Sequence, residues 1–199
     1  MKSYPRINRI LHFLLGSMMV FQLISEELMK RPKLVDGAPR IRTEEQMFFF
    51  ELHEWFGIIL LIIVGLRLSL LLGNPEEARK LFPFVSMERM KGVVAELKEI
   101  PGWFVGKITP PGDDDYVSGL VHGLGLLLGL ALGLTGTIMF VGMDPTDGTM
   151  DSFVHLMKET HEVLGELLWY YVIGHVAMAL VHQLKGHRSL QRISPLSKE

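Results

Sequence analysis

The sequence predicts an all-helical integral membrane protein, a single membrane domain over 1–199 built on four transmembrane helices. Its mean hydropathy is +0.28 although 21% of its residues are charged, so the apolar residues must be concentrated in blocks. Four blocks occur, and each is close to or above the about 20 residues that cross a hydrocarbon core as a helix. Four such runs are difficult to place in a water-soluble domain of 199 residues.

The cysteine content and the net charge exclude several kinds of site and partner. The chain has no cysteine, which excludes disulfide frameworks, thiolate zinc sites, iron–sulfur clusters and covalently attached haem. Its net charge of −2 provides no global basic field, so nucleic acid is not an expected partner. Histidine, in contrast, occurs eight times, which directs attention to imidazole chemistry.

The first two helices are expected at about 7–26 and 47–72. The first contains INRILHFLLGSMMVFQLI, and we interpret it as a retained helix rather than a signal peptide. No small-residue cleavage site follows its apolar run, and Gln22 and Glu26 come directly after it. The second contains the long apolar run FGIILLIIVGLRLSLLL.

The third and fourth helices are expected at about 117–142 and 160–184. The third carries glycines at spacings that put small residues on shared faces, where another helix or a flat ring can approach: Gly119, Gly123, Gly125, Gly129, Gly133 and Gly136. The polar connection 73–116 precedes it. Within this connection, Glu76 to Glu99 is expected to form a short amphipathic helix, 101–104 to sit at the membrane interface, and 110–112 to break the chain.

Basic residues predict the orientation, because cytoplasmic loops are enriched in Lys and Arg. One side carries six of the 20 basic residues: Lys30, Arg31, Lys33, Arg40, Arg42 and Lys158. The other 14 lie in the N-terminal tail, near the exit of the second helix, in the connection 73–116 and in the C-terminal tail. Both termini are therefore expected in the cytoplasm.

Six histidines lie in or beside the predicted helices: His12, His53, His122, His161, His175 and His182. An ionisable side chain inside a membrane helix is costly and is a functional candidate by default. A single buried histidine can simply form a hydrogen bond to a neighbouring helix, but six together favour a shared function.

The spacing of His161 and His175 indicates what these histidines bind. They are 14 residues apart, which puts them about 40° apart around one helix and about 21 Å apart in depth. His12 and His175 are expected at one depth in the membrane, and His53 and His161 are expected together at another. Two b-type haems, stacked across the bilayer and each held by two histidines, suit this arrangement. Zinc would require a tighter cluster of three or four ligands, and a proton relay would require carboxylates along its path.

Three arginines are candidates for pairing with haem propionates, which need compensating cations in a low-dielectric setting. Arg6 and Arg9 flank His12, and Arg67 lies on the cytoplasmic side of the second helix. The alternative is that these arginines extend from the membrane boundary into water.

The sequence resembles the bacterial cytochrome b561 family, which is related to the di-haem cytochrome b subunits of membrane-bound hydrogenases and formate dehydrogenases. The matching pieces cover all four helices: Tyr4-Pro5-Arg6 through His12; His53 with Gly57 and Arg67; Gly119 through His122 with Gly136; and His161-Glu162, Gly174-His175, His182, Leu190 and Ser194-Pro195. The resemblance implies His12 with His175 on the haem nearer the cytoplasm, His53 with His161 on the other, and electron exchange with quinone. The connection 73–116 is longer than in the compact stand-alone members.

Three functions stay open at this point. The leading one is a di-haem cytochrome that transfers electrons between ubiquinone or menaquinone and a periplasmic redox partner, with the protein setting the haem potentials. The second is a stand-alone superoxide:ubiquinone oxidoreductase. The third is a haem-free transporter or scaffold, whose histidines are polar packing residues.

A quinone site is expected near the cytoplasmic-side haem. His122 opens the third helix there, and His182 follows His175 by seven residues, about 20° away in azimuth and about 10 Å nearer the cytoplasm. An imidazole can hydrogen-bond a quinone carbonyl and exchange its proton. Alternatively, either histidine binds a haem propionate or faces lipid headgroups. His182 is disfavoured as an axial ligand because Gln183 and Lys185 put it close to the surface.

Overall fold

A computed structural model describes residues 5–30, 42–104, 116–144, 149–184, 190, 193 and 194 of the chain, without the side chains of 103 and 104. Every regular element within these ranges is helical. In chain order they are α1 (Arg6–Met29), α2 (Glu44–Leu72), α3 (Pro75–Leu81), the short 3₁₀ helix η1 (Pro83–Val85), α4 (Met87–Phe104), α5 (Tyr116–Gly142) and α6 (Ser152–Leu184).

The four predicted transmembrane helices are α1, α2, α5 and α6, and each is long and apolar enough to cross a membrane. Helix α2 starts earlier than expected because Thr43 and Gln46 form a reciprocal capping box at its N-terminus. The expected start of the last helix near 160 was wrong: α6 begins at Ser152. The Asp151 carboxylate accepts a hydrogen bond from the Val154 N–H at 2.8 Å, which satisfies a free donor of the first turn.

The connection between α2 and α5 differs from the single amphipathic helix expected over 76–99. It forms α3 and α4, separated by η1. Pro83 explains the break, since proline lacks an N–H and disfavours the helical conformation of the residue before it. Helix α4 continues through Pro101 to Phe104, so the segment 101–104 extends this helix. The expected break at 110–112 lies outside the described residues.

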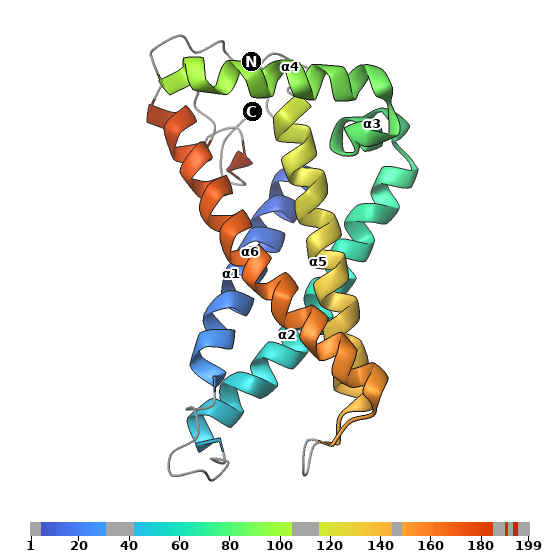
Figure 1. Ribbon diagram of the computed structural model, residues 1–199, viewed down its shortest axis with the longest axis vertical. Helices are drawn as coiled ribbons and strands as arrows, with labels where there is room; N and C mark the ends of the chain where they lie inside the picture. Colours follow the sequence, from blue (N-terminus) through green and yellow to red (C-terminus); the bar gives the residue numbers. More distant parts are fainter. Residues whose placement is uncertain are drawn as a thin grey trace.

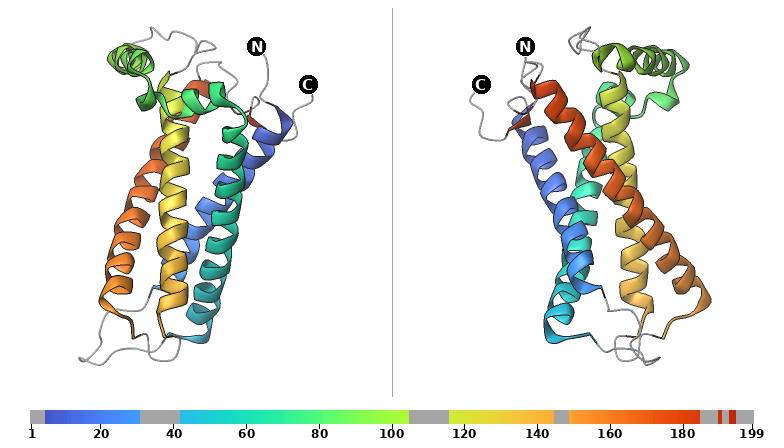
Figure 2. Two further views of the ribbon diagram at one scale, coloured as in Figure 1. Left: turned by 90° about the vertical axis from the view of Figure 1, so that its right-hand side faces the viewer. Right: turned by 60° about the vertical axis from the view of Figure 1, so that its left-hand side comes forward.

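The four long helices form an elongated bundle (Figures 1 and 2). Helix α1 packs mainly on α2, α2 on α5, and α5 on α6, whereas contacts between α6 and α1 are sparse. The start of α1 and the end of α6 lie at the same end of the bundle as α3 and α4 (Figure 1). The helix ends that flank 30–43 and 143–151 lie at the opposite end.

Helix α5 is the central element because its glycines let neighbouring helices approach closely. A Cβ on Gly129 would lie 2.7 Å from Met19 Cε of α1, and one on Gly133 would lie 2.8 Å from Leu61 Cβ of α2. Val64 packs beside this interface and is completely buried. The glycine pattern therefore serves helix packing, as small residues commonly do in membrane bundles.

Large apolar side chains cover the outside of the bundle. Ile62 and Leu66 of α2 are 57% and 56% exposed, and Tyr170 and Ile173 of α6 are 75% and 59% exposed. An apolar surface of this extent is unfavourable in water and marks contact with a membrane or a partner. Together with the helix lengths, it identifies an integral membrane protein.

Candidate functional site

Three imidazoles meet at the end of the bundle that holds α3 and α4. His12 comes from α1, His122 from α5 and His175 from α6, and one ring nitrogen of each lies within 4.8 Å of the others. The ring centroids of His12 and His175 are 6.1 Å apart, and those of His122 and His175 are 5.1 Å apart. All three side chains are half-buried. Three helices thus each bring one imidazole to the same region of the bundle.

A second pair of imidazoles lies toward the other end of the bundle. His53 of α2 and His161 of α6 have ring centroids 6.2 Å apart and planes inclined by 80°. His161 and His175 are on the same helix, about 21 Å apart along its axis. The bundle therefore has two imidazole groups at different depths, and α6 contributes one member to each.

Buried hydroxyl groups hold both imidazoles of the second pair. The Ser25 hydroxyl of α1 lies 2.9 Å from His53 Nδ1, and the Thr135 hydroxyl of α5 lies 2.9 Å from His161 Nδ1. Ser25 Oγ donates to the Gln22 carbonyl at 3.0 Å, and Thr135 Oγ1 donates to the Ala131 carbonyl at 2.8 Å. Since each hydroxyl has one proton, it accepts from the imidazole Nδ1–H. Nε2 of each imidazole then keeps its lone pair for a metal.

Gln22 and two glycines shape the surroundings of this pair. The Gln22 Nε2 donates to the main-chain carbonyl of His53 at 3.0 Å, which ties α1 to α2 beside the imidazole. A Cβ on Gly57 would lie 3.0 Å from that Nε2, so glycine leaves room for the amide. A Cβ on Gly136 would lie 3.1 Å from His161 Cε1, so glycine also leaves room for the ring.

At the three-histidine end, two neighbours orient the rings. His122 Nδ1 lies 2.7 Å from the carbonyl oxygen of Ser118, one turn earlier on α5, so this nitrogen donates its proton and Nε2 points elsewhere. The Tyr171 ring of α6 stacks on His175, with centroids 5.7 Å apart and planes inclined by 11°. The Tyr171 hydroxyl lies against Gly125, where a side chain would collide with it.

Two of the three candidate cations for propionates, Arg67 and Arg9, have partners within the chain. Arg67 Nη2 of α2 pairs with Glu77 Oε1 of α3 at 2.5 Å, and Asn8 Nδ2 donates to the same oxygen at 2.9 Å. Arg9 is 2% exposed, and its Nη1 donates to the Ser194 carbonyl at 3.3 Å. Arg6 is exposed at the start of α1. The Arg67 charge is thus already compensated by a carboxylate, which links α2 to α3.

His182 lies in the last turn of α6 and is half-buried. Within the described part of the chain, the three-histidine group consists of His12, His122 and His175, and His182 is not a member. Of the nine residues singled out in the sequence, the structure therefore gathers five histidines into two groups.

Half-buried imidazoles at two depths of a membrane bundle define a membrane-embedded protein built to hold metal or metal-containing groups by histidine. The family model of prokaryotic cytochrome b561 matches residues 3–195. The chain therefore belongs to the prokaryotic cytochrome b561 family, whose members are membrane b-type cytochromes that bind haem through histidines and transfer electrons. No curated protein sequence and no solved structure matches the chain. Family membership argues against a haem-free transporter.

The donor set fits b-type haem. With metal–nitrogen bonds of about 2 Å and each ring centre about 1.1 Å behind its nitrogen, two imidazoles on opposite sides of one metal ion have centroids about 6.2 Å apart. The observed separations are 6.1 Å for His12–His175 and 6.2 Å for His53–His161. A Cβ on Gly16, one turn beyond His12, would meet no atom within 4 Å, so the backbone there is open to a flat ring.

Four further residues of the site escaped the sequence reasoning: Gln22, Ser25, Thr135 and Tyr171. The polar side chains within the first and third apolar blocks could have indicated these residues, because a buried hydroxyl or amide needs a hydrogen-bond partner. Its partner could not be identified without the relative rotation of the helices.

Proposed function

We propose that the protein is a di-haem b-type cytochrome that transfers electrons across the membrane between the quinone pool and a redox partner on the opposite side. The observation that carries the proposal is the matched pair of imidazole separations, 6.1 Å and 6.2 Å, at two depths of one bundle. His12 with His175 would hold one haem, and His53 with His161 would hold the other.

Different residues of the chain have different roles in this proposal. The haem iron supplies one-electron redox chemistry when bound, and axial ligation, burial and hydrogen bonding by the protein tune its potential. Ser25 and Thr135 hold the two imidazoles of the His53–His161 pair with Nε2 available as ligand atom.

His122 is the proposed proton-exchanging group at the quinone. Once His12 and His175 serve as axial ligands, His122 is a third imidazole at the same end, with Nδ1 on the Ser118 carbonyl. Its Nε2 can accept a proton or a hydrogen bond from a quinol hydroxyl and, once protonated, can donate to a quinone oxygen. His182, in the last turn of α6, is the second candidate for proton exchange with the cytoplasm. The quinone is ubiquinone or menaquinone.

The proposed orientation has both termini and the helices α3 and α4 in the cytoplasm. It rests on the excess of basic residues near the start of α1, the connection 73–116 and the end of α6. The membrane is accordingly the bacterial inner membrane, and the His53–His161 haem faces the periplasm. A periplasmic partner then docks near Glu26–Gln46 and Met143–Glu159, of which 31–41 and 145–148 lie outside the described residues.

The test is haem content of purified variants by pyridine haemochrome assay. The unmodified protein should bind about two low-spin b haems, since each iron has two strong nitrogen ligands. His161→Ala should remove the haem of the His53–His161 pair, and His175→Ala the other. His155→Ala is the matched control, because His155 is on the same helix but its side chain is 59% exposed and pairs with Glu159. One haem or none in the unmodified protein contradicts the proposal, as does full haem content in both ligand variants.

A further inference from the structure

Helix α4 lies across one end of the bundle, transverse to the long helices (Figure 1). Figure 2 (left) shows it almost along its axis, to one side of α5 rather than over the middle of the bundle. One side of α4 therefore faces α5, and its underside overhangs the region that surrounds the transmembrane helices.

The contacts with α5 fix how α4 is rotated. The Glu96 carboxylate accepts hydrogen bonds from the N–H groups of Tyr116 and Val117, at 3.0 and 2.7 Å, and so caps the first turn of α5. Val93 is 1% exposed. A Cβ on Gly92 would lie 2.7 Å from the Tyr116 ring, and the Arg89 guanidinium lies 5.0 Å from the centre of the same ring. These four residues define the bundle-facing side of α4.

A second apolar strip on α4 is exposed. It consists of Met87, Val94 and Leu97, whose side chains are 76%, 46% and 48% exposed. Their positions fall within about 80° of one another around the helix and begin about 40° beyond Val93. The apolar surface of α4 thus continues from the side that packs on α5 to a side that the described residues do not cover.

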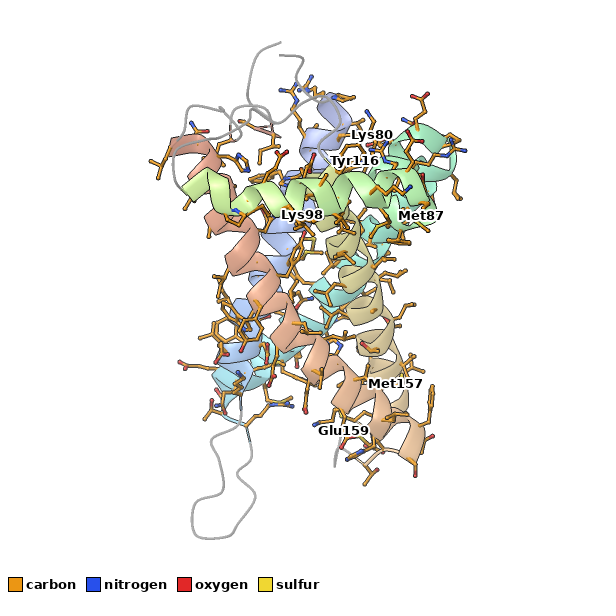
Figure 3. The ribbon with its side chains drawn as sticks, turned by 45° about the horizontal axis from the view of Figure 1, so that its top comes forward. Lys80, Met87, Lys98, Tyr116, Met157 and Glu159 are labelled. Atoms are coloured by element: carbon orange, nitrogen blue, oxygen red, sulfur yellow. The ribbon has the colours of Figure 1, made fainter. Side chains whose placement is uncertain are left out.

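Charged residues border this strip on the far side from the bundle. Lys91 and Lys98 are exposed and lie about 20–40° beyond Met87 around the helix. Figure 3 shows Met87 and Lys98 along α4, with Tyr116 beside it. Glu88, Ala95 and Glu99 are exposed and follow the lysines, about 110–150° from the centre of the strip. Around α4 the order is bundle contact, apolar strip, lysines, and a polar side.

We propose that α4 is an in-plane membrane helix, with Met87, Val94 and Leu97 at the acyl-chain boundary and Lys91 and Lys98 at the phosphates of anionic lipids. An apolar face bordered by lysines is the usual composition of helices that lie at the bilayer interface. The position of α4 agrees with this proposal, because the hydrogen bonds from Glu96 to the start of α5 put α4 level with the end of a membrane-spanning helix. Phe84 and Val85 of η1, the element just before α4, are also exposed, at 51% and 65%.

The proposal depends on the transmembrane bundle and is independent of how the haems are ligated. Each lysine near an anionic surface adds about 1 kcal/mol of attraction, and its stem can lie along the apolar boundary while the ammonium reaches the phosphate. A water-exposed α4 would leave Met87, Val94 and Leu97 in contact with water without compensation. A protein partner or second copy would cover the same strip, and the experiment separates these occupants.

The experiment uses site-directed nitroxide labelling, for which the cysteine-free sequence is a suitable background. Val94→Cys and Leu97→Cys test the strip, and Glu88→Cys and Ala95→Cys are matched controls on the polar side of the same helix. The labelled full-length protein is reconstituted in phosphatidylcholine vesicles with or without phosphatidylglycerol. Haem content shows that each variant has folded. Relaxation by oxygen, which partitions into lipid, and by a water-soluble nickel chelate then reports the surroundings of each label.

The proposal expects the strip labels to be accessible to oxygen and several-fold more protected from the chelate than the control labels. Phosphatidylglycerol should increase this protection, and the increase should be lost in Lys91→Gln/Lys98→Gln. Equal chelate accessibility of strip and control labels would overturn the proposal, because the strip would then be in water. Strip labels protected from both reagents would overturn it in favour of a protein partner or second copy. Protection unaffected by anionic lipid would overturn the assignment of the lysines.

Discussion

Replacing Thr135 with valine tests most directly whether the protein tunes the haem proposed at the His53–His161 pair. Valine has nearly the shape of threonine but no hydroxyl, so the Nδ1–H of His161 loses its acceptor at 2.9 Å. Thr135 is 8% exposed, so water cannot easily take its place. Loss of one buried hydrogen bond costs about 0.5–1.5 kcal/mol, and we expect a loss of this size in the stability of haem binding.

The same variant should shift the redox potential upward. A hydrogen bond from a charged group contributes about 1.5–3 kcal/mol and a neutral one about 1 kcal/mol. The imidazole N–H is more positive when the iron is ferric, so its hydrogen bond to the hydroxyl is stronger in the ferric state. Loss of the hydroxyl therefore destabilises the ferric state by about 0.5–2 kcal/mol more than the ferrous state. For a one-electron couple, 1.4 kcal/mol corresponds to about 59 mV. The midpoint potential of this haem should therefore rise by about 20–80 mV.

The assay is a spectroscopic redox titration of the purified protein, with electron paramagnetic resonance of the oxidised haems as the second measurement. Thr137→Val is the matched control: its hydroxyl donates to the Gly133 carbonyl at 2.7 Å, two residues further along the same helix. Thr135→Ser should restore the potential because it keeps the hydroxyl. If Thr135→Val leaves the potential and resonance signal as in Thr137→Val, the hydroxyl does not act on an axial imidazole and the reasoning fails.

Three further expectations concern packing, capping and proton exchange. Gly136→Val should lower retention of the His53–His161 haem, because even a Cβ there lies 3.1 Å from His161; Gly65→Ala, whose Cβ meets nothing within 4 Å, should retain it. Glu96→Ala should lower thermal stability by about 1 kcal/mol, as loss of a helix N-terminal acceptor typically does; an unchanged melting temperature would contradict this. His122→Phe should keep both haems but slow their reduction by quinol in stopped-flow measurements, and His182→Phe tests the second candidate. Unchanged reduction rates in both variants would remove the quinone role of these histidines.

The four transmembrane helices were predictable because their signal is local. An apolar run of about 20 residues determines a spanning helix without knowledge of its neighbours. The histidine groups were also largely predictable, since His161 and His175 on one helix define two depths by helical rise alone. The start of α6 and the break at Pro83 were harder to predict from the sequence. They depend on caps and short polar segments, in which few residues decide between helix and turn.

Only the tertiary structure decided which side chains share a site. The sequence predicted depths but not the rotation of each helix about its axis, because an almost wholly apolar helix presents no clear polar face. Rotation brings His122 beside His12 and His175, sets Thr135 on His161, and turns Arg67 to Glu77 instead of leaving it free for a propionate. It follows from packing at the glycines of α5, where backbone approach is limited by neighbouring side chains. Apolar composition thus determined membrane insertion, and close packing between helices determined the site.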